Sequence, residues 1–185
     1  PLRVALVHKH NIYAEGGDNA VRYGLGVTYN GTDGVMKNSG NDVIGMNFEL
    51  NYRKGKFRFF NKMSFDYTKK ENPTVNFSEY AKANPYFEKY DENGNVTRYL
   101  EEYYTVNRQH YTVENPLYNA SLNSYDRQKG MSFINKFNAE YRPVEEVMVR
   151  GRISLEKKSE KAEYFLSPEH TSFDGVAQTQ RGSYK

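Results

Sequence analysis

Apolar and polar residues alternate one by one along several segments of the chain, which is the pattern of a β-strand with two different faces. Between residues 43 and 53, apolar side chains at even positions from Ile44 to Tyr52 alternate with glycine, asparagine and glutamate. The same period of two predicts strands at 21–32, 43–53, 57–68, 131–142 and 147–157, and a less regular sixth strand at 2–15. The sequence therefore predicts an all-β fold.

Short and long connections between these strands alternate. The connections at 16–20, 54–56 and 143–146 are short, whereas 33–42 is longer, 69–130 is about sixty residues long, and the residues after 157 read as loop. Short turns at one end of a sheet and long loops at the other are typical of outer-membrane barrels, whereas a soluble sandwich tends to have short turns at both ends. The pattern favours an antiparallel transmembrane β-barrel segment with long extracellular loops.

The predicted strands are long. Each runs for ten residues or more, where a tilted membrane strand needs about 9–11 residues and ordinary globular strands average about 5–6. An open sheet would leave two unpaired edges, which hydrocarbon does not tolerate. The chain is therefore expected to be a fragment of a larger barrel if the membrane interpretation is right.

Composition supports a β-structure with one polar face. The chain has 17 Tyr, 11 Phe and 14 Gly, with a net charge of only +3. It has no cysteine, which excludes disulfides, thiolate metal sites and cysteine nucleophiles. Basic and acidic residues are interspersed, so nothing indicates a nucleic-acid partner.

Aromatic residues on the apolar faces lie close to the short turns. We expect four of them to form a ring at one lipid interface, as such barrels have aromatic girdles at both interfaces. These four are Tyr23, Tyr52, Phe57 and Tyr141, and Tyr29 and Tyr67 are candidates for the opposite ring. The alternative is that tyrosine is simply a good strand former.

The opposite faces of the strands are charged and rich in amides. In a wide barrel this face lines a wet or plugged lumen, and on a soluble protein it is the solvated face of a sheet. The residues expected to face the lumen are Glu49, Lys62, Asp66, Lys136, Glu140, Arg150 and Arg152.

Four strings in the connecting regions are the most specific features of the sequence. They read DNAVRYG at 18–24, GVMKNSG at 34–40, FSEYAKANPY at 77–86 and NPLYNASLNS at 115–124. In this order and spacing, the chain resembles the SusC/RagA family of TonB-dependent outer-membrane transporters from about residue 11 to residue 173.

The resemblance implies a protein of the bacterial outer membrane that imports oligosaccharides or peptides. Its barrel would have about 22 strands, of which this chain would supply about six, surrounded by outer-membrane lipid. A SusD-like surface lipoprotein would cap the barrel, and the TonB complex would supply energy through a plug domain and a TonB box. Neither part is recognised in this chain, so it is expected to be a stretch of barrel wall.

Aromatic residues of the long loop are candidates for substrate contact, because exposed rings stack on sugar faces. The candidates are Tyr80, Tyr86, Tyr103 and Tyr104. The alternative is that they pack the loop against itself, as in other compact long loops. A helical turn is predicted at 78–83, with Ser78 as its cap and Pro85 beyond its end.

No metal or cofactor site is expected. Asp91 begins an acidic, asparagine-rich string, but Val96 occupies the position where a calcium loop needs glycine, so an Asn-Gly turn is favoured. His8 and His10 share a strand face without a third ligand. No nucleophile–base grouping, phosphate loop or carboxylate pair stands out, so no enzymatic activity is expected. Two rival functions remain open: a soluble glycan-binding or adhesin β-domain, and a passive porin-like barrel.

Overall fold

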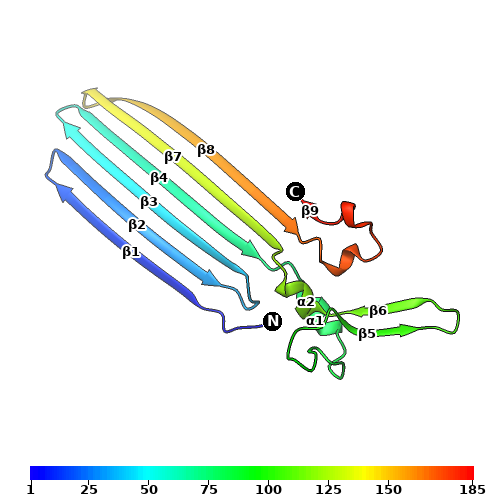
Figure 1. The fold of residues 1–185 in the computed structure, drawn as a ribbon. Coiled ribbons are helices and arrows are strands. Elements are labelled where there is room, and N and C mark those ends of the chain that lie inside the picture. Colours follow the sequence, from blue (N-terminus) through cyan, green and yellow to red (C-terminus); the bar gives the residue numbers. More distant parts are fainter.

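The computed structural model describes residues 1–185, and its main feature is an open antiparallel sheet of seven strands (Figure 1). The strand order is β1-β2-β3-β4-β7-β8-β9, and every neighbouring pair is antiparallel. The bounds are β1 Val7–Gly17, β2 Val21–Asp33, β3 Gly40–Lys54, β4 Phe57–Asn72, β7 Tyr125–Val144, β8 Val147–Leu166 and β9 Ser183–Tyr184. The predicted all-β, antiparallel fold is confirmed.

The connections separate into two kinds at opposite ends of the sheet (Figure 1). Residues 18–20, 55–56 and 145–146 make the short turns, and this end is called the turn end. Residues 34–39, 73–124 and 167–182 make the longer connections, and this end is called the loop end. Glycines with positive φ, Gly17 at 119° and Gly55 at 55°, allow the chain to reverse in two of the short turns.

The first strand begins later than predicted. Residues 1–6 lie outside β1, and Leu2 forms only an isolated bridge with Met36. The backbone N–H of Arg3 donates to the carbonyl oxygen of Val35, and its guanidinium donates to the carbonyl oxygens of Gly34 and Ser39. The apolar start of the chain is therefore tied to the β2–β3 loop instead of extending the sheet.

Strands β4, β7 and β8 extend farther toward the loop end than predicted. The predicted loop 69–130 shrinks to 73–124, and β8 continues to Leu166 rather than ending at 157. The added part of β8 is charged on both faces, so the hydrophobic alternation stops there. Backbone pairing with β7 nevertheless continues to Tyr125 and Phe165.

The connection 73–124 contains small elements of its own. They are helix α1 (Phe77–Lys82), the hairpin β5 (Tyr99–Tyr104) and β6 (His110–Glu114), and helix α2 (Pro116–Ser121). The turns η1 (Thr171–Phe173) and η2 (Gln178–Gln180) follow β8. None of these helices is both long enough and apolar enough to cross a membrane. The helical turn predicted at 78–83 begins one residue earlier, and its N-cap is Asn76 rather than Ser78.

The buried side chains lie at the loop end, not on the long sheet. Within the seven-stranded sheet only Gly24, Gly26 and Gly31 are buried. The buried apolar side chains are Val75 and Leu100, both in the connection 73–124. Neither face of the long sheet is covered by another layer of this chain.

Candidate functional site

Strand register gathers most of the apolar side chains of β2, β3, β4, β7 and β8 on one face of the sheet. Leu25 pairs with Phe48, and Phe65 of β4 pairs with both Met46 of β3 and Phe133 of β7. We call this continuous surface the apolar belt. It covers residues 21–29 of β2, 44–52 of β3, 57–67 of β4, 131–141 of β7 and 147–155 of β8, at alternate positions.

The belt is uncovered and narrower than the strands that carry it. Ile153 and Leu155 are 61% and 62% exposed. Strand β8 has 20 residues and β3 has 15, yet the belt spans nine residues on each, 147–155 and 44–52. The width of the apolar surface is therefore nearly constant although the strand lengths differ.

The edge of the belt at the loop end is level across β2, β3, β4 and β7, and it steps toward the turn end on β8. Pairing through β4 and β7 places Ser159 of β8 level with Ile44 of β3. The belt on β8 nevertheless ends at Leu155, because Lys157 and Ser159 are polar. On β8 this edge lies four residues nearer the turn end than on β3.

At the turn end the belt extends two residues beyond the level of Tyr52 on β4 and β7, to Phe57 and Tyr141, and four residues on β8. Gly151 of β8 is level with Tyr52 of β3, but the belt on β8 continues to Val147.

The four aromatic residues predicted for a lipid interface lie on the belt, close to the turn end. The rings of Phe57 and Tyr141 stack with centroids 4.5 Å apart. Tyr52 is partly exposed, and Tyr23 is 52% exposed. They form the last or next-to-last position of the belt on four neighbouring strands.

Register places all seven residues predicted to face a lumen on the sheet face opposite the belt. Opposite charges meet there across strands: Lys62 Nζ lies 2.5 Å from Glu49 Oε1, and Glu140 lies between two arginines. The distances to Glu140 are 2.7 Å from Arg150 and 3.8 Å from Arg58. Asp66, Lys136 and Arg152 occupy the same face without an ion pair.

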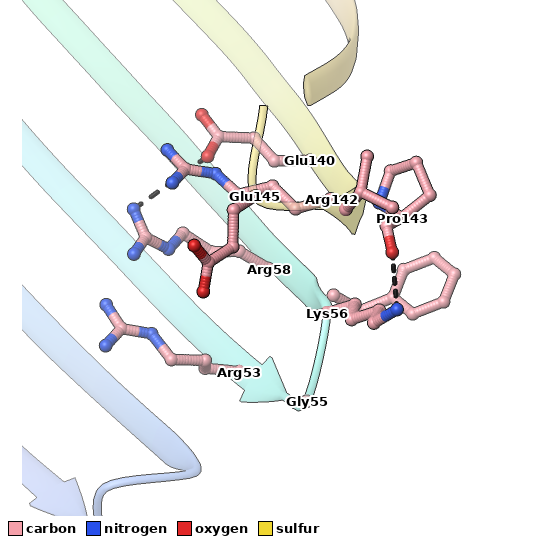
Figure 2. Close-up of a pocket in the computed structure, with 10 residues that line it drawn as sticks. Arg53, Gly55, Lys56, Arg58, Glu140, Arg142, Pro143 and Glu145 are labelled. Atoms are coloured by element: carbon pink, nitrogen blue, oxygen red, sulfur yellow. Dashed lines mark hydrogen bonds and ion pairs between the residues drawn. The ribbon is translucent and has the colours of Figure 1, made fainter. Parts of the chain in front are cut away.

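At the turn end this polar face forms an open hollow lined by arginines (Figure 2). Arg53, Arg58 and Arg142 extend into it from β3, β4 and β7, beside Glu140 and Glu145. With Glu140 already paired to Arg58 and Arg150, the hollow carries an excess of positive charge. An acidic or hydrogen-bond-accepting surface would fit it.

Two asparagines within the apolar belt escaped the sequence interpretation. Asn61 of β4 and Asn135 of β7 lie at belt positions, and the amide nitrogen of Asn61 donates to the amide oxygen of Asn135 at 2.6 Å. The strict alternation of apolar residues is interrupted at 61 and 135. Those two interruptions were the signal that could have identified the pair.

Polar side chains fasten the connections at the loop end to each other. The buried amide of Asn115 donates to the carbonyl oxygens of Thr97 at 2.7 Å and Lys89 at 3.2 Å. Asn119 donates to Thr171 Oγ1 at 2.7 Å and accepts from its backbone N–H at 3.2 Å. The connections 73–124 and 167–182 therefore form one packed unit.

An ion pair adds to this unit. Asp174 accepts hydrogen bonds from the Arg98 guanidinium and the Tyr99 hydroxyl. Partial burial opposes the charged carboxylate, but the hydrogen bonds from Tyr99 and Arg98 outweigh it and hold the pKa of Asp174 below its ordinary value. Arg98 also lies over the ring of Tyr118, 5.4 Å from its centroid.

The four tyrosines proposed for substrate contact do not come together in one site. Tyr80 is partly buried, and burial raises its pKa. Tyr86 is 92% exposed, and Tyr103 and Tyr104 lie on the β5–β6 hairpin, which projects from the loop end (Figure 1). On that hairpin the Tyr103 ring stacks on Tyr111 at 5.5 Å.

The features considered for metal binding have other uses in the structure. The His8 and His10 rings lie 5.5 Å apart beside Tyr29, and no group of three or more potential metal ligands is present. The Asp91 carboxylate accepts from the backbone N–H groups of Asn93 and Asn95, at 2.9 and 2.8 Å. With Gly94 at φ 82°, this string forms the turn predicted for it.

The chain matches no protein-family model, and no curated protein matches it. The functional assignment therefore depends on the resemblance carried by the four strings and on the geometry of the sheet.

Proposed function

We propose that this chain forms part of the barrel wall of a SusC-like TonB-dependent transporter in the bacterial outer membrane. The observation that carries the membrane part of the proposal is the uncovered apolar belt, which spans nine to eleven residues on each of five neighbouring strands. A belt of nearly constant width is what a hydrocarbon layer of fixed thickness imposes on the strands that cross it.

The dimensions of the belt agree with a membrane. At the tilt of about 35–45° usual for barrel strands, nine to eleven residues span roughly 20–25 Å along the normal, close to the apolar band of about 25 Å of outer-membrane barrels. Beyond residue 155, β8 continues for eleven residues with charges on both faces. Such an extension suits a strand that leaves the bilayer and rises into water.

A second sheet packed on the belt is the main alternative cover. A sandwich interior would also bury apolar side chains, but nothing in a sandwich sets a fixed width that is independent of strand length. The exposed apolar side chains of β8 also lie near the sheet edge, where a packed sheet would end. Lipid accounts for both features together.

The polar face is then the inner surface of the wall. Its charges are partly paired, as between Lys62 and Glu49, and it leaves cationic groups at the turn end, which would face the periplasm. We assign this face to contact with a plug domain, whose movement by the TonB complex would admit the nutrient.

The connections at the loop end would form the outer vestibule, where an oligosaccharide or a peptide and a SusD-like lipoprotein would bind. The projecting hairpin offers exposed aromatic rings, including Tyr104, which is 72% exposed. Aromatic rings on a rigid support bind sugar faces and protein surfaces alike, so substrate class is left to experiment.

The experiment uses a strain lacking the full-length gene, complemented with the wild-type gene, in backgrounds with and without a working TonB complex. Growth is measured on single oligosaccharides and peptides as the sole nutrient, and the protein is located by membrane fractionation. The proposal predicts an outer-membrane protein whose uptake requires TonB. Uptake that persists without TonB would indicate the porin, and recovery in the soluble fraction would indicate the adhesin.

A further inference from the structure

Lysines line the apolar belt where it ends toward the loops. On β4, β7 and β8 the first belt-face position beyond the apolar side chains is a lysine: Lys69 follows Tyr67, Lys129 precedes Met131, and Lys157 follows Leu155. Each of three consecutive strands therefore places an ammonium group at the edge of the belt. This cluster is called the lysine row.

Register sets further positive charge beside the row. Lys129 lies directly opposite Lys69 on one side and Lys161 on the other. Like charges opposite each other on neighbouring strands destabilise a sheet. Arg127 adds a fifth cation on the same face.

Carboxylates of the same face neutralise only part of this charge. Lys69 pairs with Glu71 at 3.1 Å, and Lys161 pairs with Glu163. Asp42 is opposite Lys69, and its carboxylate accepts from the Tyr29 hydroxyl. Three carboxylates face five cations, and Lys129 and Lys157 take part in no ion pair.

We propose that the lysine row binds the phosphate groups of a phosphorylated glycolipid in the outer leaflet of the membrane. This inference rests on the proposed function, since it requires the belt to face lipid. The row continues the belt directly, because Lys129 is the next belt-face position after Met131 on β7 and Lys157 the next after Leu155 on β8. Lys157 lies opposite Phe133, four residues nearer the turn end than Lys129, so lipid phosphates would be bound at two depths along the belt edge. Phosphate oxygens would bridge lysines that otherwise repel one another.

A free anion fits the row less well than a lipid. The site is an exposed strip with no enclosing pocket, so a soluble phosphate would gain only screened charge contacts. A lipid adds contact of its acyl chains with the belt. Cations near an anionic membrane surface each contribute on the order of 1 kcal/mol, so several together give measurable retention.

The test compares two double variants of the full-length protein in nanodiscs. K129Q/K157Q removes the two lysines of the row that have no ion pair, one from β7 and one from β8. K136Q/R152Q is the matched control, because it removes two unpaired cations from the same strands on the opposite face. Nanodiscs of phosphatidylcholine contain either phosphorylated lipid A or its dephosphorylated form, and native mass spectrometry measures the lipid retained.

The proposal predicts that wild type and K136Q/R152Q retain phosphorylated lipid A, and that K129Q/K157Q retains at least about tenfold less. Equal retention by K129Q/K157Q and wild type would overturn it, as would equal retention of the dephosphorylated lipid or full displacement by inorganic phosphate. Membrane insertion is measured on the same samples. Failure of wild type to insert refutes the membrane assignment itself, whereas normal insertion with equal retention refutes only the lipid site.

Discussion

Asn61 and Asn135 form a hydrogen bond of 2.6 Å between β4 and β7, in the middle of a surface that is otherwise apolar. Each lies near the centre of the belt on its strand, which spans 57–67 on β4 and 131–141 on β7. In a bilayer these positions would be at mid-depth, where an unpaired amide has no water to bind. Each asparagine therefore supplies the partner that the other one needs.

Replacing one of these asparagines is predicted to cost more than replacing both. N61L or N135L leaves one amide unpaired and should lower the free energy of unfolding in lipid vesicles by about 1–3 kcal/mol. The double variant N61L/N135L should be close to wild type, because both polar groups leave together. Urea titrations in vesicles measure all four members of this cycle, and additive losses would show that the pair carries no coupling.

A charge on the belt is predicted to affect the protein differently from a charge on the neighbouring residue. I153R places a guanidinium on the belt and should reduce stability in a bilayer by about 2–4 kcal/mol. S154R lies on the opposite face and should change stability by less than about 1 kcal/mol. Folded yield and unfolding in vesicles measure the difference. If S154R has the larger effect, the polar face rather than the belt is the one that contacts lipid.

The packed unit at the loop end is predicted to loosen in acid. The pKa of Asp174 is lowered in the folded state, so the unfolded state binds the proton more tightly. The stabilisation is present above the ordinary value of 3.8 and is lost as pH falls through the lowered folded value. Hydrogen exchange of the amides at 98–99 and 171–174, measured down to about pH 3, should reveal this loss.

A second group has to be separated in that measurement. Burial lowers the pKa of His170, which removes stability as pH falls below its ordinary value of 6.5. The variant H170N keeps an acceptor for the Ser172 N–H without titrating in this range, so the comparison is made in this background. Adding D174N should then remove most of the remaining increase in amide hydrogen exchange at low pH. If the increase persists in D174N, groups other than Asp174 cause it.

Charge reversal on the polar face is predicted to alter transport more than assembly. K62E places two carboxylates together at Glu49, and R150E does the same at Glu140. Because this face would contact the plug, both variants should assemble normally while plug retention or uptake changes. Heat-modifiable mobility and uptake assays separate the two effects. Failed insertion with unchanged uptake per inserted molecule would contradict this role.

The sequence predicted those parts of the fold in which hydrophobic alternation and strand coincide. The alternation from Ile44 to Tyr52 lies within β3, and β4 begins at Phe57 as expected. Alternation could not predict β8 beyond residue 157, since charged residues there occupy both faces. That part of the strand is held by backbone pairing with β7, which leaves no periodic signal.

The geometry of the apolar belt and of the lysine row could be predicted less well from the sequence. The period of two assigned each side chain to a face, but the step of the belt edge on β8 depends on register between strands far apart in the sequence, such as those of Ile44 and Ser159. The lysine row has the same origin, because Lys69 and Lys129 meet only through the β4–β7 pairing. The four candidate tyrosines were chosen from the sequence one by one, without a prediction of the distances between them. Tyr86 and Tyr103 lie apart because they belong to different parts of the folded connection 73–124.

The central claim is tested most directly by spin labels along β3 and β8. The described chain has no cysteine, so single cysteines can be introduced at each position of 40–54 and 147–166 in the full-length protein in bilayers. Accessibility is then measured to oxygen, which partitions into lipid, and to a water-soluble nickel complex. The account predicts oxygen maxima at alternate positions of 44–52 and 147–155, with the β8 maximum displaced four residues toward the turn end relative to register. Equal access of the nickel complex to both faces, or a belt shielded from both reagents by protein, would contradict it.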